Sequence, residues 1–218
     1  ASAATLARHI SEVLSNPTKP RWLLRDELEW GVIAVVAGPR GTYKSFLAIN
    51  WAMRVAVAGH AVYVVSAEGG DFDRRARAWL LYFAPEIRFE DLPLYVVERR
   101  LDLSGKEGID TLREDCAKLR IKPKLFICDT LSKLSGALDE NENTAVKAFI
   151  GRLDNGLKRA ETAFDATVLV VAHTGHSDAG RPRGASALGA DTDAEYIVSR
   201  SEGTQTVTVT RERFKASP

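Results

Sequence analysis

Short apolar runs alternate along the chain with longer segments whose apolar residues recur every three or four positions. Uninterrupted apolar runs are typical of strands buried on both faces of a parallel sheet, and they occupy residues 32–37, 61–68, 92–98, 124–130 and 166–174. Helical periodicity marks residues 46–57, 71–83, 108–120 and 144–160, with Thr144 as the expected N-cap of the last segment. Strands that alternate with helices predict an α/β domain with a mostly parallel central sheet flanked by helices.

Toward the end of the chain the pattern changes to an alternation of polar and apolar residues. Residues 194–201 and 204–212 flank the turn signal Glu202-Gly203 and predict two closing antiparallel strands. The glycine-rich, basic stretch before them, residues 174–191, has no apolar periodicity and is expected to be a loop. We treat residues 1–218 as a single domain in which residues 1–20 form an N-terminal segment. Because the sequence begins at Ala1 rather than a methionine and ends close to a strand, we expect a domain excised from a longer chain.

Composition narrows the classes of function. The chain is 45% hydrophobic over 218 residues, which is enough to bury a full core without a metal or a disulfide. Its 30 basic and 29 acidic residues leave no global field, so any contact with DNA must be local. Cys116 and Cys128 are expected to be reduced thiols of a cytosolic protein. No apolar run approaches the roughly 20 residues of a membrane span and no signal peptide is visible, which predicts a cytoplasmic protein with no membrane partner.

The most informative motif is GVIAVVAGPRGTYKS at residues 31–45, in which an apolar strand leads into a glycine loop and a helix. Such a loop directs backbone N–H groups, a helix N-terminus and the ammonium of Lys44 at a single spot that binds phosphate. The P-loop pattern G-x-x-x-x-G-K-[ST] is met except that Tyr43 stands in place of the second glycine. A bulky residue with positive φ is an outlier. One hypothesis is therefore that Gly41 takes the tight turn and leaves Tyr43 in helical geometry; an ordinary strand, turn and helix with a surface Lys-Ser pair is the alternative.

Polar residues end the other predicted strands, namely Glu68, Asp129 and His173. Ligands of parallel sheets sit at the carboxyl ends of the strands, so these groups are expected to converge on the glycine loop. Lys44 would reach the β- and γ-phosphates, Ser45 and Asp129 would hold Mg²⁺ and its water shell, Glu68 would deprotonate the attacking water, and His173 would sense the γ-phosphate. Together these roles predict hydrolysis of a nucleoside triphosphate, ATP with Mg²⁺. Taken singly, a capping aspartate, a solvated glutamate and a structural histidine are alternative interpretations.

These motifs resemble the RecA-type ATPase core, and within it the RepA-like plasmid and phage helicases, which are relatives of the DnaB-type hexameric enzymes. The resemblance spans roughly residues 20–215 and is carried by GPRGTYKS, by VVSAEGG with Arg77 downstream, by LFICDTL, and by VVAHTGH followed by RGASAL. It implies a RecA-like P-loop NTPase core that hydrolyses ATP. It also implies a homo-oligomer, a hexamer, that acts on single-stranded DNA.

The resemblance assigns roles to individual residues. Lys44 and Ser45 match the Walker A pair, Asp129 matches Walker B, Glu68 matches the catalytic carboxylate, and His173 falls at the polar sensor position. The nucleotide is expected to contact the whole loop and the start of its helix, which comprise Gly38, Pro39, Arg40, Gly41, Thr42, Tyr43, Lys44, Ser45 and Phe46.

Basic residues outside the loop receive roles in the same way. Arg77 is expected beside the base or the phosphates. Arg211 and Arg213 match the basic finger that reaches the γ-phosphate of a neighbouring subunit in hexameric helicases. The two loops in which RecA-like rings touch single-stranded DNA contain residues that would contact phosphates without reading sequence: Lys133, His176, Arg181 and Arg183.

The sequence thus predicts an ATP-hydrolysing, ring-forming motor on single-stranded DNA in plasmid or phage replication. One alternative keeps the ATPase but drops translocation, as in a helicase loader or a recombination mediator that nucleotide switches. A small-molecule P-loop kinase is a further alternative, although the chain shows no distinct lid of phosphate-facing arginines. DNA-stimulated hydrolysis with strand displacement favours the motor, whereas stimulation by a protein partner favours the loader.

Overall fold

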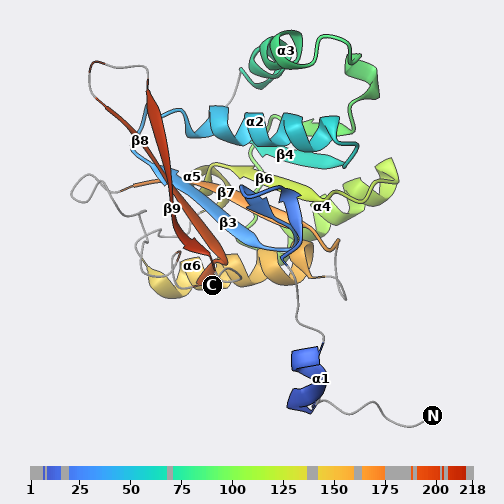
Figure 1. The fold of residues 1–218 in the computed structure, drawn as a ribbon, viewed down its shortest axis with the longest axis vertical. Helices are drawn as coiled ribbons and strands as arrows, with labels where there is room; N and C mark the ends of the chain where they lie inside the picture. The colour runs from blue at the N-terminus through green and yellow to red at the C-terminus, as the bar shows by residue number, and fades with distance from the viewer. Residues whose placement is uncertain are drawn as a thin grey trace.

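The computed structural model describes residues 7, 9–15, 20–67, 71–136, 142–159, 164–174, 188, 191–201, 203 and 206–214, and the side chains of all of these except 213 and 214. Over this part of the chain the fold is a seven-stranded sheet flanked by helices, with a small two-stranded sheet beside it (Figure 1). The strand order is β5-β4-β6-β7-β3-β8-β9. The strands are β3 (Ile33–Gly38), β4 (Val62–Ser66), β5 (Leu94–Val97), β6 (Leu125–Asp129), β7 (Thr167–His173), β8 (Ala194–Arg200) and β9 (Val207–Phe214).

Parallel pairing joins the strands from β5 through to β8, and β9 pairs antiparallel with β8. The mostly parallel sheet and the closing antiparallel strands predicted from the sequence are therefore confirmed. Strand β3 lies between β7 and β8 and is buried along its whole length. A strand covered on both faces must be apolar at every position, which explains the uninterrupted run before the glycine loop.

The sheet separates two apolar cores, because successive side chains of a strand point to opposite faces. On one face Val36 packs in the core beneath α2 (Lys44–Val57) and α3 (Phe72–Phe83). On the other face Val35 packs in the core beneath α4 (Lys106–Leu119), α5 (Leu131–Leu134) and α6 (Asn143–Leu153). Figure 1 shows α2 and α3 on the opposite side of the sheet from α6, and α1 (Ile10–Ser15) apart from the body of the fold.

Helix α6 differs from its prediction at both ends. It begins at Asn143 with Glu142 as the N-cap residue, so the expected cap at Thr144 is wrong. Its C-terminal end continues into a π-helical turn, η2 (Asp154–Lys158), rather than as regular helix to residue 160. The apolar pattern marks which residues are buried, but it does not encode this change in backbone hydrogen bonding. A short 3₁₀ turn, η1 (Phe89–Asp91), completes the helical elements of the described chain.

A hairpin that the apolar pattern does not predict, β1 (Trp22–Leu24) and β2 (Leu28–Glu29), packs beside α2 and β8. Its turn residue Glu27 accepts hydrogen bonds from Trp51 at 3.0 Å and from Arg54 at 2.6 Å, and the Glu27 carbonyl accepts one from the Tyr196 hydroxyl. The hydrogen bond from Arg54 holds the pKa of Glu27 below its ordinary value. The hairpin is thereby fixed to the helix that follows the glycine loop.

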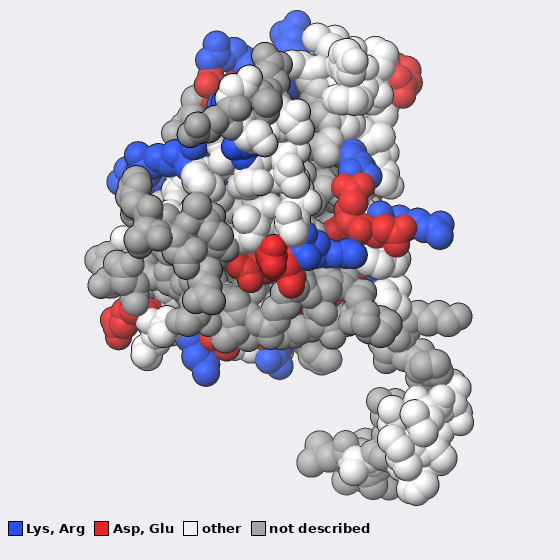
Figure 2. Space-filling view, turned by 60° about the vertical axis from the view of Figure 1, so that its left-hand side comes forward, with Lys and Arg blue, Asp and Glu red and all other residues white. Residues whose placement is uncertain are grey.

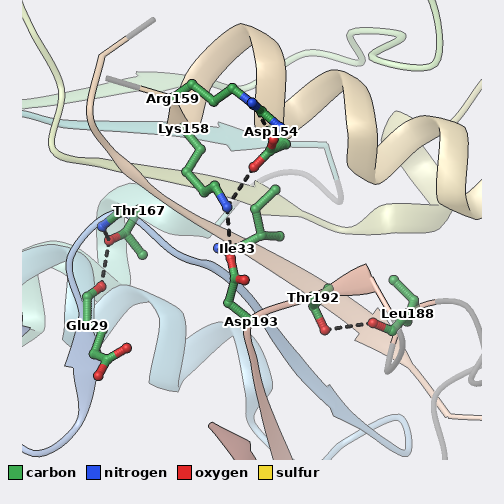
Figure 3. A network of polar contacts seen from close by, with 10 residues as sticks. Glu29, Ile33, Asp154, Lys158, Arg159, Thr167, Leu188, Thr192 and Asp193 are labelled. Carbon is green, nitrogen blue, oxygen red and sulfur yellow. Dashed lines mark hydrogen bonds and ion pairs between the residues drawn. The ribbon is translucent and has the colours of Figure 1, made fainter. Parts of the chain in front are cut away.

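A partly buried ionic network fixes the amino end of β3 (Figure 3). The Lys158 ammonium lies 2.6 Å from Asp154 and 3.0 Å from Asp193, and Arg159 lies 2.6 Å from Asp154. Asp193 also accepts a hydrogen bond from the backbone N–H of Ile33 at 2.9 Å. Burial acts to raise the pKa of Asp154, but the hydrogen bonds from Lys158 and Arg159 outweigh it and hold that pKa below its ordinary value. The network joins η2 to the first residues of β8 and of the loop-bearing strand.

Replacing Lys158 by Met should lower the free energy of unfolding by about 2 to 3 kcal/mol at pH 7, because two carboxylates lose a charged donor. The folded-state pKa of Asp154 is lowered, so the stability it contributes is present above about pH 4 and is lost as the pH falls through the folded value. Urea unfolding of wild type and variant at pH 7 and pH 3 measures both effects. The difference between the two proteins should shrink at pH 3.

Arg159→Met is the matched control, since the Arg159 side chain is 54% exposed and an exposed pair contributes about 0 to 1 kcal/mol. Equal losses for both variants, or a Lys158→Met loss that does not change with pH, would contradict the role given to the network.

Candidate functional site

The carboxyl ends of β3, β4, β6 and β7 bring the predicted groups to one edge of the sheet. Gly38 pairs with His173, and Asp129 pairs with Ser66 on one side and Val171 on the other. A cavity of about 640 Å³ opens at this edge. Its lining comes from the glycine loop, the first turn of α2 and the ends of the neighbouring strands: Arg40, Gly41, Tyr43, Lys44, Ser45, Phe46, Ala67, Arg75, Arg100, Thr130, Lys133 and His173.

The first glycine of the loop is required by close packing. A Cβ atom added at Gly38 would lie 2.2 Å from the carbonyl oxygen of Val198 in the neighbouring strand. The turn is closed by the Thr42 hydroxyl, which donates to the Pro39 carbonyl at 2.9 Å. The Lys44 ammonium donates to the same carbonyl at 2.8 Å and its side chain is buried, so its charge is held over the loop. Helix α2 starts at Lys44, which places the unpaired N–H groups of its first turn at the cavity.

Tyr43 takes the backbone conformation of the missing glycine. Its φ is 65° and its ψ is 28°, in the left-handed region, while Gly41 has a φ of 78°. The hypothesis that Gly41 alone makes the turn and leaves Tyr43 in helical geometry is therefore wrong. A residue with a Cβ costs about 1 to 2 kcal/mol in this conformation. The loop keeps a P-loop path at the expense of local strain.

The Tyr43 side chain makes contacts that offset this strain. Its ring lies edge-on to the ring of Phe46, with 5.4 Å between centroids, and the guanidinium of Arg200 lies 5.2 Å from the Tyr43 centroid. Contacts of this kind contribute about 0.5 to 1.5 kcal/mol. Tyr43 is nevertheless 41% exposed, so burial of its ring does not explain why the chain carries it.

The remaining residues of the predicted machinery fall into three groups. Ser45 and His173 line the cavity, whereas Asp129 is buried at the end of β6 next to Thr130, which lines it. Lys133, predicted to contact DNA, instead lines the nucleotide cavity from α5. Several predicted side chains lie outside the described residues: Glu68, His176, Arg181, Arg183 and Arg213.

Arg77 does not lie at the cavity where the resemblance places it. It lines a separate cavity of about 470 Å³ on another side of α3, with its guanidinium 5.8 Å from the ring centroid of Phe89. Arg75 lines the loop cavity instead, because two positions on a helix are about 200° apart and face different ways. The helical period of α3 could have identified this difference, whereas no sequence signal marks Arg100, which also lines the cavity.

Arg211 lies away from the cavity of its own subunit. It stands opposite Tyr196, which pairs with Val36 in the middle of the sheet, and its guanidinium donates to the Asp26 carbonyl at 3.2 Å. The nearest described arginine of the closing strands to the loop is Arg200, which contacts Tyr43. Any contact of Arg211 with a γ-phosphate would therefore have to involve another subunit.

The oxygen donors of the site suit Mg²⁺ rather than a protein-enclosed metal. Ser45 offers a hydroxyl and Asp129 a carboxylate, and Mg²⁺ is commonly held by one or two such groups together with substrate phosphates. Over the residues that the structure describes, no cluster of three or more His, Cys, Asp or Glu side chains could hold a metal by itself. The residues present fit a magnesium nucleotide.

Comparison with known proteins identifies the fold. The AAA domain family model matches residues 3–179. Among solved structures, the chain is similar to the ATPase domain of a DnaB-type helicase, with 14% identity and a TM-score of 0.62 over 86% of this chain and 78% of that chain. Curated proteins give no sequence match. The predicted resemblance to RecA-like ATPases of the helicase type is confirmed. No helix within the described ranges is long and apolar enough to cross a membrane.

The left-handed conformation of residue 43 predicts an inverted order of two substitutions. Tyr43→Gly should be more stable than Tyr43→Ala by about 1 kcal/mol, because only glycine adopts positive φ without steric cost. In the exposed part of α4, Ala117→Gly should show the ordinary order and lose about 1 kcal/mol. Urea unfolding of the three variants measures the differences. An alanine at position 43 as stable as the glycine would mean that this backbone is not left-handed in solution.

Proposed function

Since this chain belongs to the AAA domain family and has the RecA-like fold, we propose that it is a ring-forming, ATP-hydrolysing motor that moves along single-stranded DNA in plasmid or phage replication. The observation that supports it best is the cavity at the carboxyl ends of the parallel strands. There the buried ammonium of Lys44, the hydroxyl of Ser45 and the imidazole of His173 line one space. ATP hydrolysis is the reaction that uses all three.

In this proposal the protein acts by positioning and by neutralising charge. Lys44 leaves its contact with the Pro39 carbonyl to meet the phosphates, where negative charge grows during phosphoryl transfer. Ser45 and Asp129 hold Mg²⁺, which when bound neutralises phosphate charge. Glu68 accepts the proton of the attacking water, and His173 hydrogen-bonds near the γ-phosphate at the end of β7.

Contact with DNA would come from the segment that follows β7, through His176, Arg181 and Arg183. On the face drawn in Figure 2, basic and acidic side chains lie interspersed with uncharged surface rather than in one basic field. A local loop of like charge is therefore a better source of phosphate contacts than the body of the domain. Such contacts are independent of base sequence, as a motor requires.

The first test compares ATP hydrolysis by wild type and Lys44→Ala, with and without single-stranded DNA. The variant should lose about 10²-fold or more in rate, because one preorganised charged donor is removed from the phosphates. Lys118→Ala, a lysine on the exposed surface of α4, should keep the wild-type rate. DNA should raise the wild-type rate. Normal turnover in a folded Lys44→Ala protein would exclude the glycine loop as the site, and stimulation by a protein partner alone would favour a loader.

A second test asks whether the finger acts between subunits. The double variant Arg211→Ala/Arg213→Ala and the single variant Glu68→Gln should each lose about 10³-fold or more in rate. Mixing the two should restore part of the activity, because one kind of interface then pairs an intact Glu68 with an intact finger. Activity should also rise with protein concentration. Absence of rescue, together with a rate per subunit that does not depend on concentration, would remove the finger from the proposal.

A further inference from the structure

A second hollow adjoins the phosphate cavity. The groove between α2 and α3 has a volume of about 720 Å³ and shares two lining residues, Phe46 and Arg75, with the cavity at the glycine loop. Aromatic rings from both helices and from the end of α3 form much of its wall, including Trp79, Tyr82 and Phe83. The two hollows are thus neighbours across a single pair of side chains.

Phe46 and Arg75 form a stacked pair at the junction. The guanidinium of Arg75 lies 4.5 Å from the Phe46 ring centroid, and the Phe46 residue is 47% exposed. Phe46 is also the second residue after Lys44 in the first turn of α2, where unpaired N–H groups bind phosphate. The part of a nucleotide that is not phosphate therefore has this pair beside it when the phosphates occupy the loop.

Polar groups along the groove are already engaged with the protein. The Asp71 carboxylate accepts a hydrogen bond from Arg74 and lies 3.6 Å from Arg75. The Trp79 indole donates to Asn50 at 2.8 Å. Discrimination between bases depends on polar groups built to bind base edges. Planar ring and guanidinium faces, by contrast, stack on any base.

We infer that the groove between α2 and α3 binds the base and ribose of the nucleotide by stacking at Phe46 and Arg75, without reading the base edge. The inference rests on the proposed function and extends it from the phosphates to the whole substrate. It assigns the enzyme to purine nucleotides in general rather than to ATP alone, since purines offer the larger stacking face. Adenine and guanine nucleotides should bind with similar affinity.

The chain offers a matched control for this pair. Arg77 lies over Phe89 much as Arg75 lies over Phe46, and Phe89 is 50% exposed, but the second pair lines the other cavity of α3. Removing either phenylalanine deletes a half-exposed aromatic ring beside an arginine. Only Phe46 adjoins the phosphates.

Isothermal titration of the full chain with ATP, GTP, CTP and inorganic tripolyphosphate, each with Mg²⁺, tests the inference. Phe46→Ala should weaken ATP and GTP binding by about 5- to 100-fold, the range that corresponds to loss of one base-stacking contact. Tripolyphosphate, which has no base, should bind the variant as it binds wild type. Phe46→Tyr should restore ATP affinity, and Phe89→Ala should leave every ligand unaffected.

The outcomes separate this inference from the proposed function. ATP binding that Phe46→Ala leaves unchanged, or a variant that loses ATP and tripolyphosphate equally, would overturn the groove while keeping a phosphate site. A strong preference of wild type for ATP over GTP would overturn recognition by stacking alone. Failure of wild type to bind either ATP or tripolyphosphate would overturn the proposed function and this inference with it. Thermal unfolding of each variant verifies that the fold is retained.

Discussion

The backbone conformation of residue 43 connects the strand that carries the loop to the helix that follows it. Strand β3 is buried on both faces and cannot shift, and Gly38 is pressed against the Val198 carbonyl. Helix α2 packs in the core above the sheet and begins at Lys44. With both ends fixed, the loop must turn sharply just before Lys44. Tyr43 has to adopt positive φ whatever its side chain, and the position of the Lys44 ammonium follows from that turn.

The same constraint explains the surroundings of the site. A glycine would make the turn without strain, so the tyrosine needs contacts to offset its cost, and Phe46 and Arg200 supply them. Phe46 in turn carries Arg75, which extends the chain of aromatic and cationic contacts from the end of β8 to α3. The residues that border the phosphate cavity are thus coupled to one another through ring contacts. The loop, the closing strands and α3 meet at the place where a nucleotide would enter.

Much of the fold could be predicted because burial on two faces leaves a clear mark in the sequence. Each of the central strands appears as an apolar run, and the pairing of Gly38 with His173 and of Asp129 with Ser66 follows from parallel order. The hairpin around Glu27 was missed because its strands are only three and two residues long and its anchors are far away in sequence. The π-helical turn was missed because its ionic partners, such as Asp193, belong to another strand.

The candidate site was predictable where a motif fixes chemistry and spacing together, as at Lys44, Ser45 and His173. It was less predictable where direction decides, since Arg75 and Arg77 differ in the face of α3 that they occupy and not in chemistry. The conformation of Tyr43 could not be read from its type, because residue preference argues against positive φ and the fixed ends of the loop override that preference.

The most direct test of this account is a crystal structure of the protein with Mg²⁺ and a non-hydrolysable ATP analogue. The account predicts that Tyr43 keeps its positive φ, that the Lys44 ammonium moves from the Pro39 carbonyl to the β- and γ-phosphates, and that the triphosphate lies against the first turn of α2. A nucleotide bound elsewhere on the domain would contradict it, as would a Tyr43 that enters the helix while Lys44 remains on the Pro39 carbonyl.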